Sequence, residues 1–218
     1  VFVVSFIIAY YAASQPAARY ALSYDTEKQP WYSCLSATMA HMNEGHLFGN
    51  VAIGIPAGCL LEIAEGPFRL AVVMWGAATQ AAAGHSLWYG RDVTLAGASG
   101  AIYGMLWNKL AILALNWSEM PLRWVRLVVA IVLLAYEIYM AQTLEGVSHA
   151  CHGFGALAGI TTGLCVAENL RFQRGEAALT LAGLLVYSVM GIALAASGQT
   201  AAGGLSLVIV PVRARPPA

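Results

Sequence analysis

Long apolar runs separated by short polar stretches make up most of the chain. A membrane-spanning helix needs about 20 mostly apolar residues, and seven runs approach or reach that length. They cover approximately residues 1–21, 45–63, 68–83, 95–117, 122–142, 147–167 and 177–196. The pattern therefore predicts an all-α membrane protein with seven transmembrane helices.

Prolines, glycines and charged residues mark the ends of these runs. The first run is broken near Pro16 and begins within apolar sequence at Val1, so we expect the first helix to be truncated. The stretch 84-GHSLWYGRDVT-94 is expected to form a polar loop in which His85 is solvated. We expect one membrane domain, with a six-helix core over residues 1–167 and a linker, an additional transmembrane helix and a tail over residues 168–218.

Composition agrees with a membrane protein and excludes other classes. Hydrophobic residues make up 59% of the chain and charged residues only 10%, whereas about a quarter of a soluble domain is charged. The lipid bilayer is therefore the expected partner. The 11 basic and 11 acidic residues form no basic patch, so no nucleic-acid partner is expected. The distribution of Lys and Arg places the N-terminus in the cytosol and the start of the fourth helix on the opposite side.

Polar side chains within apolar runs are costly in a bilayer and mark candidate functional positions. Three clusters have this property. The first is 41-HMNEGHLFGN-50, in which His46 and Asn50 share one helix face. The second is Ser99 with Tyr103 one turn later, and the third is 149-HACHGFGALAG-159.

Glycine spacing indicates how the second and third clusters meet. Gly100 and Gly104 form one four-residue step, and Gly155, Gly159 and Gly163 form a longer stripe, which allows close helix approach in lipid. If these stripes pack together, Ser99 and His152 come within hydrogen-bonding reach.

A neutral histidine can take the proton of a serine and so activate it as a nucleophile. The side chains of His46 and Asn50 and the Ser99 amide could stabilise an oxyanion. The residues thus match a serine hydrolase with a Ser–His dyad. No carboxylate has the spacing of a third member, since neither Glu137 nor Glu145 is distinguished by its position.

These residues resemble the rhomboid family of intramembrane serine proteases. The family's second helix carries the pattern His-x4-His-x3-Asn, which 41–50 reproduces, and its fourth helix opens with Gly-x-Ser-Gly, matched by 97-GASG-100. The resemblance covers approximately residues 31–165. It implies the following roles: nucleophile Ser99, general base His152, an oxyanion hole of His46, Asn50 and the Ser99 amide, Tyr103 stacked on the histidine ring, and supporting positions at Gly97, His41, Gly155 and Gly159.

The resemblance also implies a reaction and a partner. The expected activity is hydrolysis of a peptide bond in or near a substrate's transmembrane helix, with the site opening to the non-cytoplasmic face and substrate access beside the fifth helix. No cofactor and no metal site are expected, and the oligomeric state is left open. Two alternatives stand beside this hypothesis: a catalytically inactive rhomboid-like protein that binds membrane clients, and an unrelated transporter with polar helices. His149 is expected to be an interfacial histidine outside the catalytic pair.

Overall fold

The computed structural model describes residues 8–11, 15–24, 32–89, 94–143, 146–171 and 175–200, with the side chains of 193–200 left aside. Within these ranges the regular structure is helical, apart from one antiparallel bridge between Tyr24 and Leu95. The helices are α2 (Pro16–Leu22), α3 (Ser33–Ser36), α4 (Glu44–Tyr89), α5 (Ser99–Leu115), α6 (Arg123–Thr143), α7 (His149–Val166) and α8 (Glu176–Thr200). The predicted all-α fold class is confirmed.

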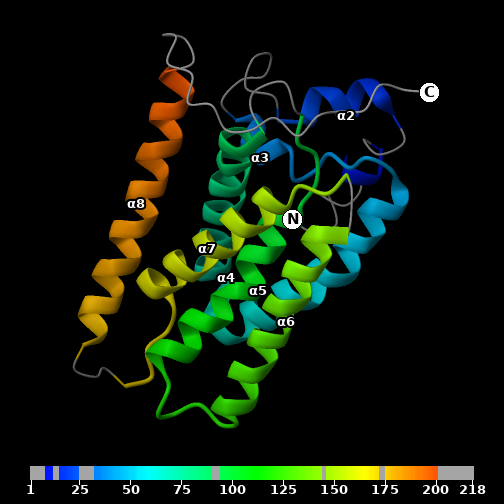
Figure 1. Ribbon diagram of the computed structural model, residues 1–218. Coiled ribbons are helices and arrows are strands. Elements are labelled where there is room, and N and C mark those ends of the chain that lie inside the picture. The colour runs from blue at the N-terminus through cyan, green and yellow to red at the C-terminus, as the bar shows by residue number, and fades with distance from the viewer. Residues whose placement is uncertain are drawn as a thin grey trace.

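The second and third predicted helices form one long element, α4, with a break at Gly66. This glycine has φ 83° and ψ 165°, a conformation that is easily adopted only without a side chain, and Pro67 starts the second half. Figure 1 shows the two halves of α4, cyan and then teal, running in different directions. The sequence predicted the two apolar runs correctly but not that they would join without a loop.

Two other predictions differ from the structure at element ends. Helix α4 continues to Tyr89, so much of the stretch expected to be a polar loop is helical. The first predicted helix lies partly outside the described residues; within them, residues 8–11 are helical and α2 begins at Pro16, with the proline at the first helical position. The tail beyond residue 200 also lies outside the described part of the chain.

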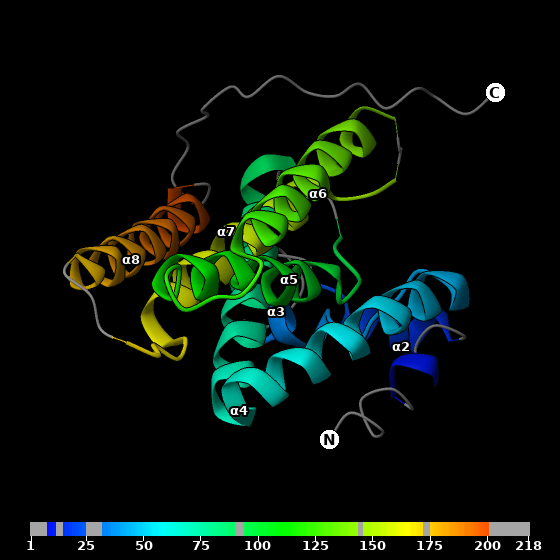
Figure 2. The ribbon, with the colours of Figure 1, turned by 90° about the horizontal axis from the view of Figure 1, so that it is seen from below.

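The core of the molecule is a close contact among the second half of α4, α5 and α7, which lie together at the centre of the bundle (Figures 1 and 2). Small residues form this contact. A Cβ added at Gly104 would collide with Ala77 of α4, and one added at Gly84 would collide with the Phe154 ring of α7. The site residues are therefore placed by backbones that approach closely, as expected where small residues line helix crossings.

Two helices flank this core in different ways. Helix α8 packs on α7, where Thr180 Oγ1 donates a hydrogen bond to the Leu164 carbonyl at 3.0 Å and Met190 packs against Ala158. Helix α6, by contrast, has no buried residue along its length. Helices α4 and α6 are long and apolar enough to cross a membrane. An apolar helix with no buried face is typical of one that is surrounded by lipid.

Candidate active site

The segment before α5 fixes where Ser99 begins its helix. The backbones of Tyr24 and Leu95 exchange two hydrogen bonds of 2.9 Å, and the Gly97 amide donates to the Ala37 carbonyl at 2.9 Å. The long loop before α4 therefore braces this segment through its backbone. Ser99 follows as the first residue of α5, and N–H groups in a first turn have no partner within the helix.

Gly97 allows His46 to approach the serine. Its φ of 138° suits only glycine, and a Cβ there would lie 2.9 Å from His46 Cε1, 3.2 Å from His46 Nε2 and 3.9 Å from Ser99 Oγ. The imidazole of His46 and the hydroxyl of Ser99 therefore flank the same small space. A side chain at position 97 would fill it.

Hydrogen bonds of the first turn of α4 orient His46. Its amide donates to Asn43 Oδ1 at 2.8 Å, so Asn43 caps the helix. The Met42 amide lies 3.4 Å from His46 Nδ1, which accepts the hydrogen bond in the tautomer that protonates Nε2. In that tautomer Nε2, which would lie 3.2 Å from a Cβ at Gly97, carries an N–H that can serve as a donor.

Asn50 is half-buried, one turn after His46. Its side-chain Nδ2 donates to the His46 carbonyl at 3.0 Å. An amide carries two N–H groups, so one further donor is available for another acceptor. The structure thus ties Asn50 to the same helix turn as His46.

His41 lies in the loop before α4 and is buried. Its Nδ1 donates to the Met39 carbonyl at 3.4 Å, and its Nε2 is buried without a hydrogen-bond partner. Burial, followed by the neighbouring His46, lowers the pKa of His41 to about 4. The ring contacts His46 edge-on, with centroids 5.2 Å apart, so His41 supports His46 as a neutral neighbour.

The expected glycine contact between α5 and α7 is present. A Cβ at Gly155 would collide with the Gly100 carbonyl, and one at Gly159 would collide with the Gly104 carbonyl. Because the residue numbers increase together along this contact, the two helices run parallel. The first turn of α5, with Ser99, is therefore beside the first turn of α7, with His152.

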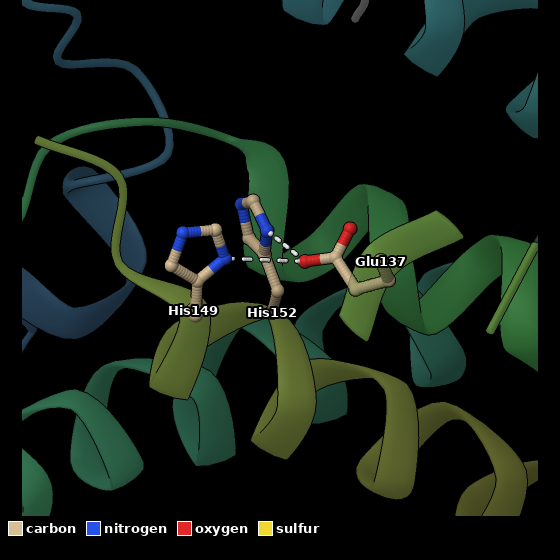
Figure 3. Close-up of side chains that lie close together, drawn as sticks. All are labelled: Glu137, His149 and His152. Carbon is tan, nitrogen blue, oxygen red and sulfur yellow. Dashed lines mark hydrogen bonds and ion pairs between the residues drawn. The ribbon is translucent and has the colours of Figure 1, made fainter. Parts of the chain in front are cut away.

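His152 is held on two sides. The Tyr103 ring stacks on its imidazole, with centroids 4.1 Å apart and planes 12° apart. On its edge, Nδ1 lies 3.0 Å from Glu137 Oε1 of α6. Figure 3 shows the Glu137 carboxylate directed at the histidine rings of α7. The same carboxylate accepts a hydrogen bond from the Tyr103 hydroxyl.

The contact made by Glu137 corrects the expectation that no carboxylate is well placed. Sequence spacing could not reveal it, because Glu137 and His152 belong to different helices whose relative rotation is set by packing. One signal was available: Glu137 is the only charged residue in the apolar stretch of α6 between Arg126 and Thr143. A carboxylate at such depth is expected to have a partner.

Two other histidines were interpreted wrongly or incompletely. His85 was expected to be solvated, but it is buried in α4, and its Nδ1 lies 2.7 Å from Ser148 Oγ, the cap of α7. His149 was expected at the interface. It is half-buried beside the site, with its Nδ1 3.5 Å from Glu137 Oε1 and its ring edge-on to His152.

Glu137, His149 and His152 also form a group whose ligand atoms all lie within 4.8 Å of one another. Two imidazoles and a carboxylate are a donor set that zinc accepts. The sequence expectation of no metal site did not consider Glu137 as a neighbour of these histidines. The hydrogen bonds of Glu137 to Tyr103 and His152 already satisfy the carboxylate without a metal.

The fold and these side chains define an all-helical membrane protein with a serine, histidines and an asparagine gathered at the starts of packed helices. The Rhomboid domain family model matches residues 28–169. The chain belongs to the rhomboid family and is an integral membrane protein.

Two relatives support this assignment. The chain is 32% identical over 157 residues to Rhomboid-related protein 1 of Caenorhabditis elegans, covering 68% of this chain and 43% of that protein. It is 28% identical over 141 residues to Rhomboid-like protein 11, chloroplastic, of Arabidopsis thaliana, covering 60% of this chain and 50% of that protein. The chain thus spans about half the length of these curated relatives.

Proposed function

We propose that the protein is an intramembrane serine protease with Ser99 as nucleophile and His152 as general base. The observation that carries the proposal is the glycine contact between α5 and α7, because it sets the turn of Ser99 beside the turn of His152. The rhomboid-type function of the family supports it. The substrate would be a protein with a transmembrane helix, and the site would open to the non-cytoplasmic face.

The reaction follows from these groups. His152 takes the Ser99 proton as Oγ attacks the scissile carbonyl carbon, and the carbonyl oxygen becomes an oxyanion. As the C–N bond breaks, the histidine returns that proton to the leaving amine, which leaves an acyl group on Oγ. Water then adds to the acyl carbon with the same histidine as base, and the acid product and the free serine are released.

Three groups could donate hydrogen bonds to the oxyanion in the proposed reaction. The Ser99 amide is at the positive end of α5, His46 can present Nε2–H across Gly97, and Asn50 retains one N–H. Donors aimed at a developing charge stabilise the transition state more than the ground state. These side chains are therefore assigned to the oxyanion hole.

A fluorophosphonate probe on the purified full chain tests the proposal. The wild type should be labelled at Ser99 and should cleave a single-span substrate. Ser99→Ala and His152→Ala should abolish both activities, while His149→Ala should retain most of each. If the wild type is neither labelled nor able to cleave any member of a single-span substrate panel, the protein is an inactive client-binding relative and the proposal is wrong.

A further inference from the structure

The Glu137 carboxylate is the polar link between α6 and the site. Its side chain is one-fifth exposed, and it meets groups from two other helices. Oε2 accepts from the Tyr103 hydroxyl of α5, while Oε1 faces Nδ1 of His152 at 3.0 Å and Nδ1 of His149 at 3.5 Å (Figure 3). Both carboxylate oxygens are therefore used within the site.

Together these contacts fix the imidazole of His152. The Tyr103 face restricts tilting of the ring, and the bond at Nδ1 restricts its rotation about the Cβ–Cγ bond. A carboxylate accepts and does not donate, so the proton of a neutral His152 must be on Nδ1. Nε2 then carries the lone pair that can take a proton from Ser99.

We propose that Glu137 is a positioning residue for His152, so that Ser99, His152 and Glu137 act as a triad assembled from three helices. The proposal rests on the proposed protease function. Glu137 remains ionised throughout; the moving proton travels from Ser99 Oγ to His152 Nε2 and then to the leaving amine. While the imidazole is protonated, the carboxylate opposite Nδ1 stabilises its charge, as the third member of a serine triad does.

The simplest alternative is that the contacts of Glu137 only compensate a carboxylate placed in an apolar helix and have no effect on His152. Hydrogen bonds from any neighbouring donors would serve that purpose, and none of them would need to come from His152. The structure instead places Oε1 at Nδ1 of His152, which leaves Nε2 as the nitrogen that can accept a proton, and Tyr103 contacts both the ring and the carboxylate. This arrangement favours the tautomer of His152 that carries its proton on Nδ1.

The test compares Glu137→Ala, Glu137→Gln and the wild type. Glu62→Gln is the matched control, since Glu62 is an exposed carboxylate of α4. Each variant is assayed for fluorophosphonate labelling of Ser99 and for kcat and KM on a soluble peptide and on a single-span substrate. Thermal unfolding shows which variants are folded, and the isosteric Glu137→Gln carries the test if Glu137→Ala does not fold.

We expect Glu137→Ala to lower kcat and slow labelling by at least about 10- to 100-fold, the effect of removing a partner that orients a metal-binding histidine, and by up to about 10⁴-fold if it matches the carboxylate of a serine triad. KM should stay within about twofold for both substrates, because an interaction used in the transition state is lost and binding is not. Glu137→Gln should fall between the two, since its amide oxygen still accepts from Nδ1 without the charge.

Three results would overturn the positioning role. Wild-type kcat in both Glu137 variants would show that the contact is incidental. A loss confined to the single-span substrate would assign Glu137 to substrate access instead. Loss of wild-type activity in a chelator, restored by zinc, would show that Glu137, His149 and His152 hold a metal. In each case Ser99 labelling of the wild type would leave the protease proposal standing, whereas a wild type that is neither labelled nor able to cleave the single-span substrates would refute that proposal itself.

Discussion

At the scale of single residues, His46 shows how a small set of contacts prepares a polar group for one task. The Asn43 cap fixes its backbone, the Met42 amide occupies Nδ1, and Gly97 leaves room for the opposite edge of the ring. A group that is oriented before reaction loses little free energy by reorganising when charge develops. His46 is therefore better described as a hydrogen-bond donor than as a base.

This description predicts graded losses of turnover when donors of the proposed oxyanion hole are removed. Removing one such donor lowers turnover by about 100- to 1,000-fold in a comparable hydrolase. We expect His46→Ala and Asn50→Ala each to reduce kcat by an amount in that range, while Ser99→Ala leaves no measurable turnover. Steady-state assays on a soluble peptide measure the difference. Wild-type kcat in both variants would remove these side chains from the oxyanion hole.

His41 makes stability depend on pH. Burial lowers its pKa from an ordinary 6.5 to about 4, so the unfolded chain takes up a proton that the folded chain does not. The stability from neutral His41 is complete above about pH 6.5 and is lost as pH falls towards 4. With one pKa unit equal to about 1.4 kcal/mol, the loss is about 3 kcal/mol.

The measurement is the thermal unfolding midpoint in detergent at several pH values from 7 to 4.5. His41→Gln cannot take up a proton in this range, so its midpoint should fall less steeply with acid than that of the wild type. The comparison uses the slopes, because the substitution also changes packing. Parallel slopes would mean that His41 does not carry the acid sensitivity.

At the scale of elements, the parallel contact between α5 and α7 is the feature on which the site depends. Two glycines of each helix meet at backbone distance, and their sequence spacing sets the register of Ser99 against His152. In lipid there is no hydrophobic driving force between helices, so association depends on close van der Waals packing, which small residues allow. Any side chain at the contact must push the two first turns apart.

Gly159→Ala therefore should disrupt the site from two turns away. The added Cβ would meet the Gly104 carbonyl, and relief requires movement of backbone. We expect a loss of about 1–3 kcal/mol in stability, the cost of overpacking a close contact, together with slower Ser99 labelling. Gly153→Ala is the matched control on α7, because a Cβ there meets nothing within 4 Å. Equal behaviour of the two variants would argue against the contact.

Most helix positions and the main helix contact could be predicted from the sequence, for physical reasons. Apolar run length predicts where the long helices lie, and the four-residue glycine step predicts the α5–α7 contact that is observed. Gly66 was harder, since a break by a single residue looks in sequence like a short loop. Glu137 and His85 were missed because their partners come from other helices, and no local pattern records how a helix is rotated towards its neighbours.

At the scale of the whole molecule, the helices differ in how firmly they are held. Helices α4, α5 and α7 share the core, and α8 is hydrogen-bonded to α7, whereas α6 has no buried residue. In the C-terminal half of α6, Tyr136 and Tyr139 are 57% and 61% exposed, which leaves Glu137 as the main polar contact of this half with the core. A loosely packed element is the one expected to move at low cost.

In the proposed reaction, a substrate helix reaches Ser99 from the bilayer, where its peptide bonds are already paired and shielded. We expect it to enter by displacing the C-terminal half of α6, to unwind near the site, and to react once α6 has returned and Glu137 again contacts His152. Tyr136→Ala and Tyr139→Ala should therefore raise turnover of a single-span substrate, because they remove bulk from the helix that must give way. A soluble peptide reaches the site from water and should gain less. Turnover of both substrates by each variant is the measurement.

A cross-link supplies the opposite change. A cross-link between the C-terminal half of α6 and the first half of α4 should stop cleavage of the single-span substrate. The soluble peptide should still be hydrolysed, since Glu137 keeps its contact with His152. The control is a cross-link between α7 and α8 at positions 164 and 183, where a Cβ at Gly183 lies 2.8 Å from that of Leu164. This pair should leave both substrates unaffected, because α8 is already held against α7. Unchanged cleavage of the single-span substrate after pinning α6 would show that access does not run between α4 and α6.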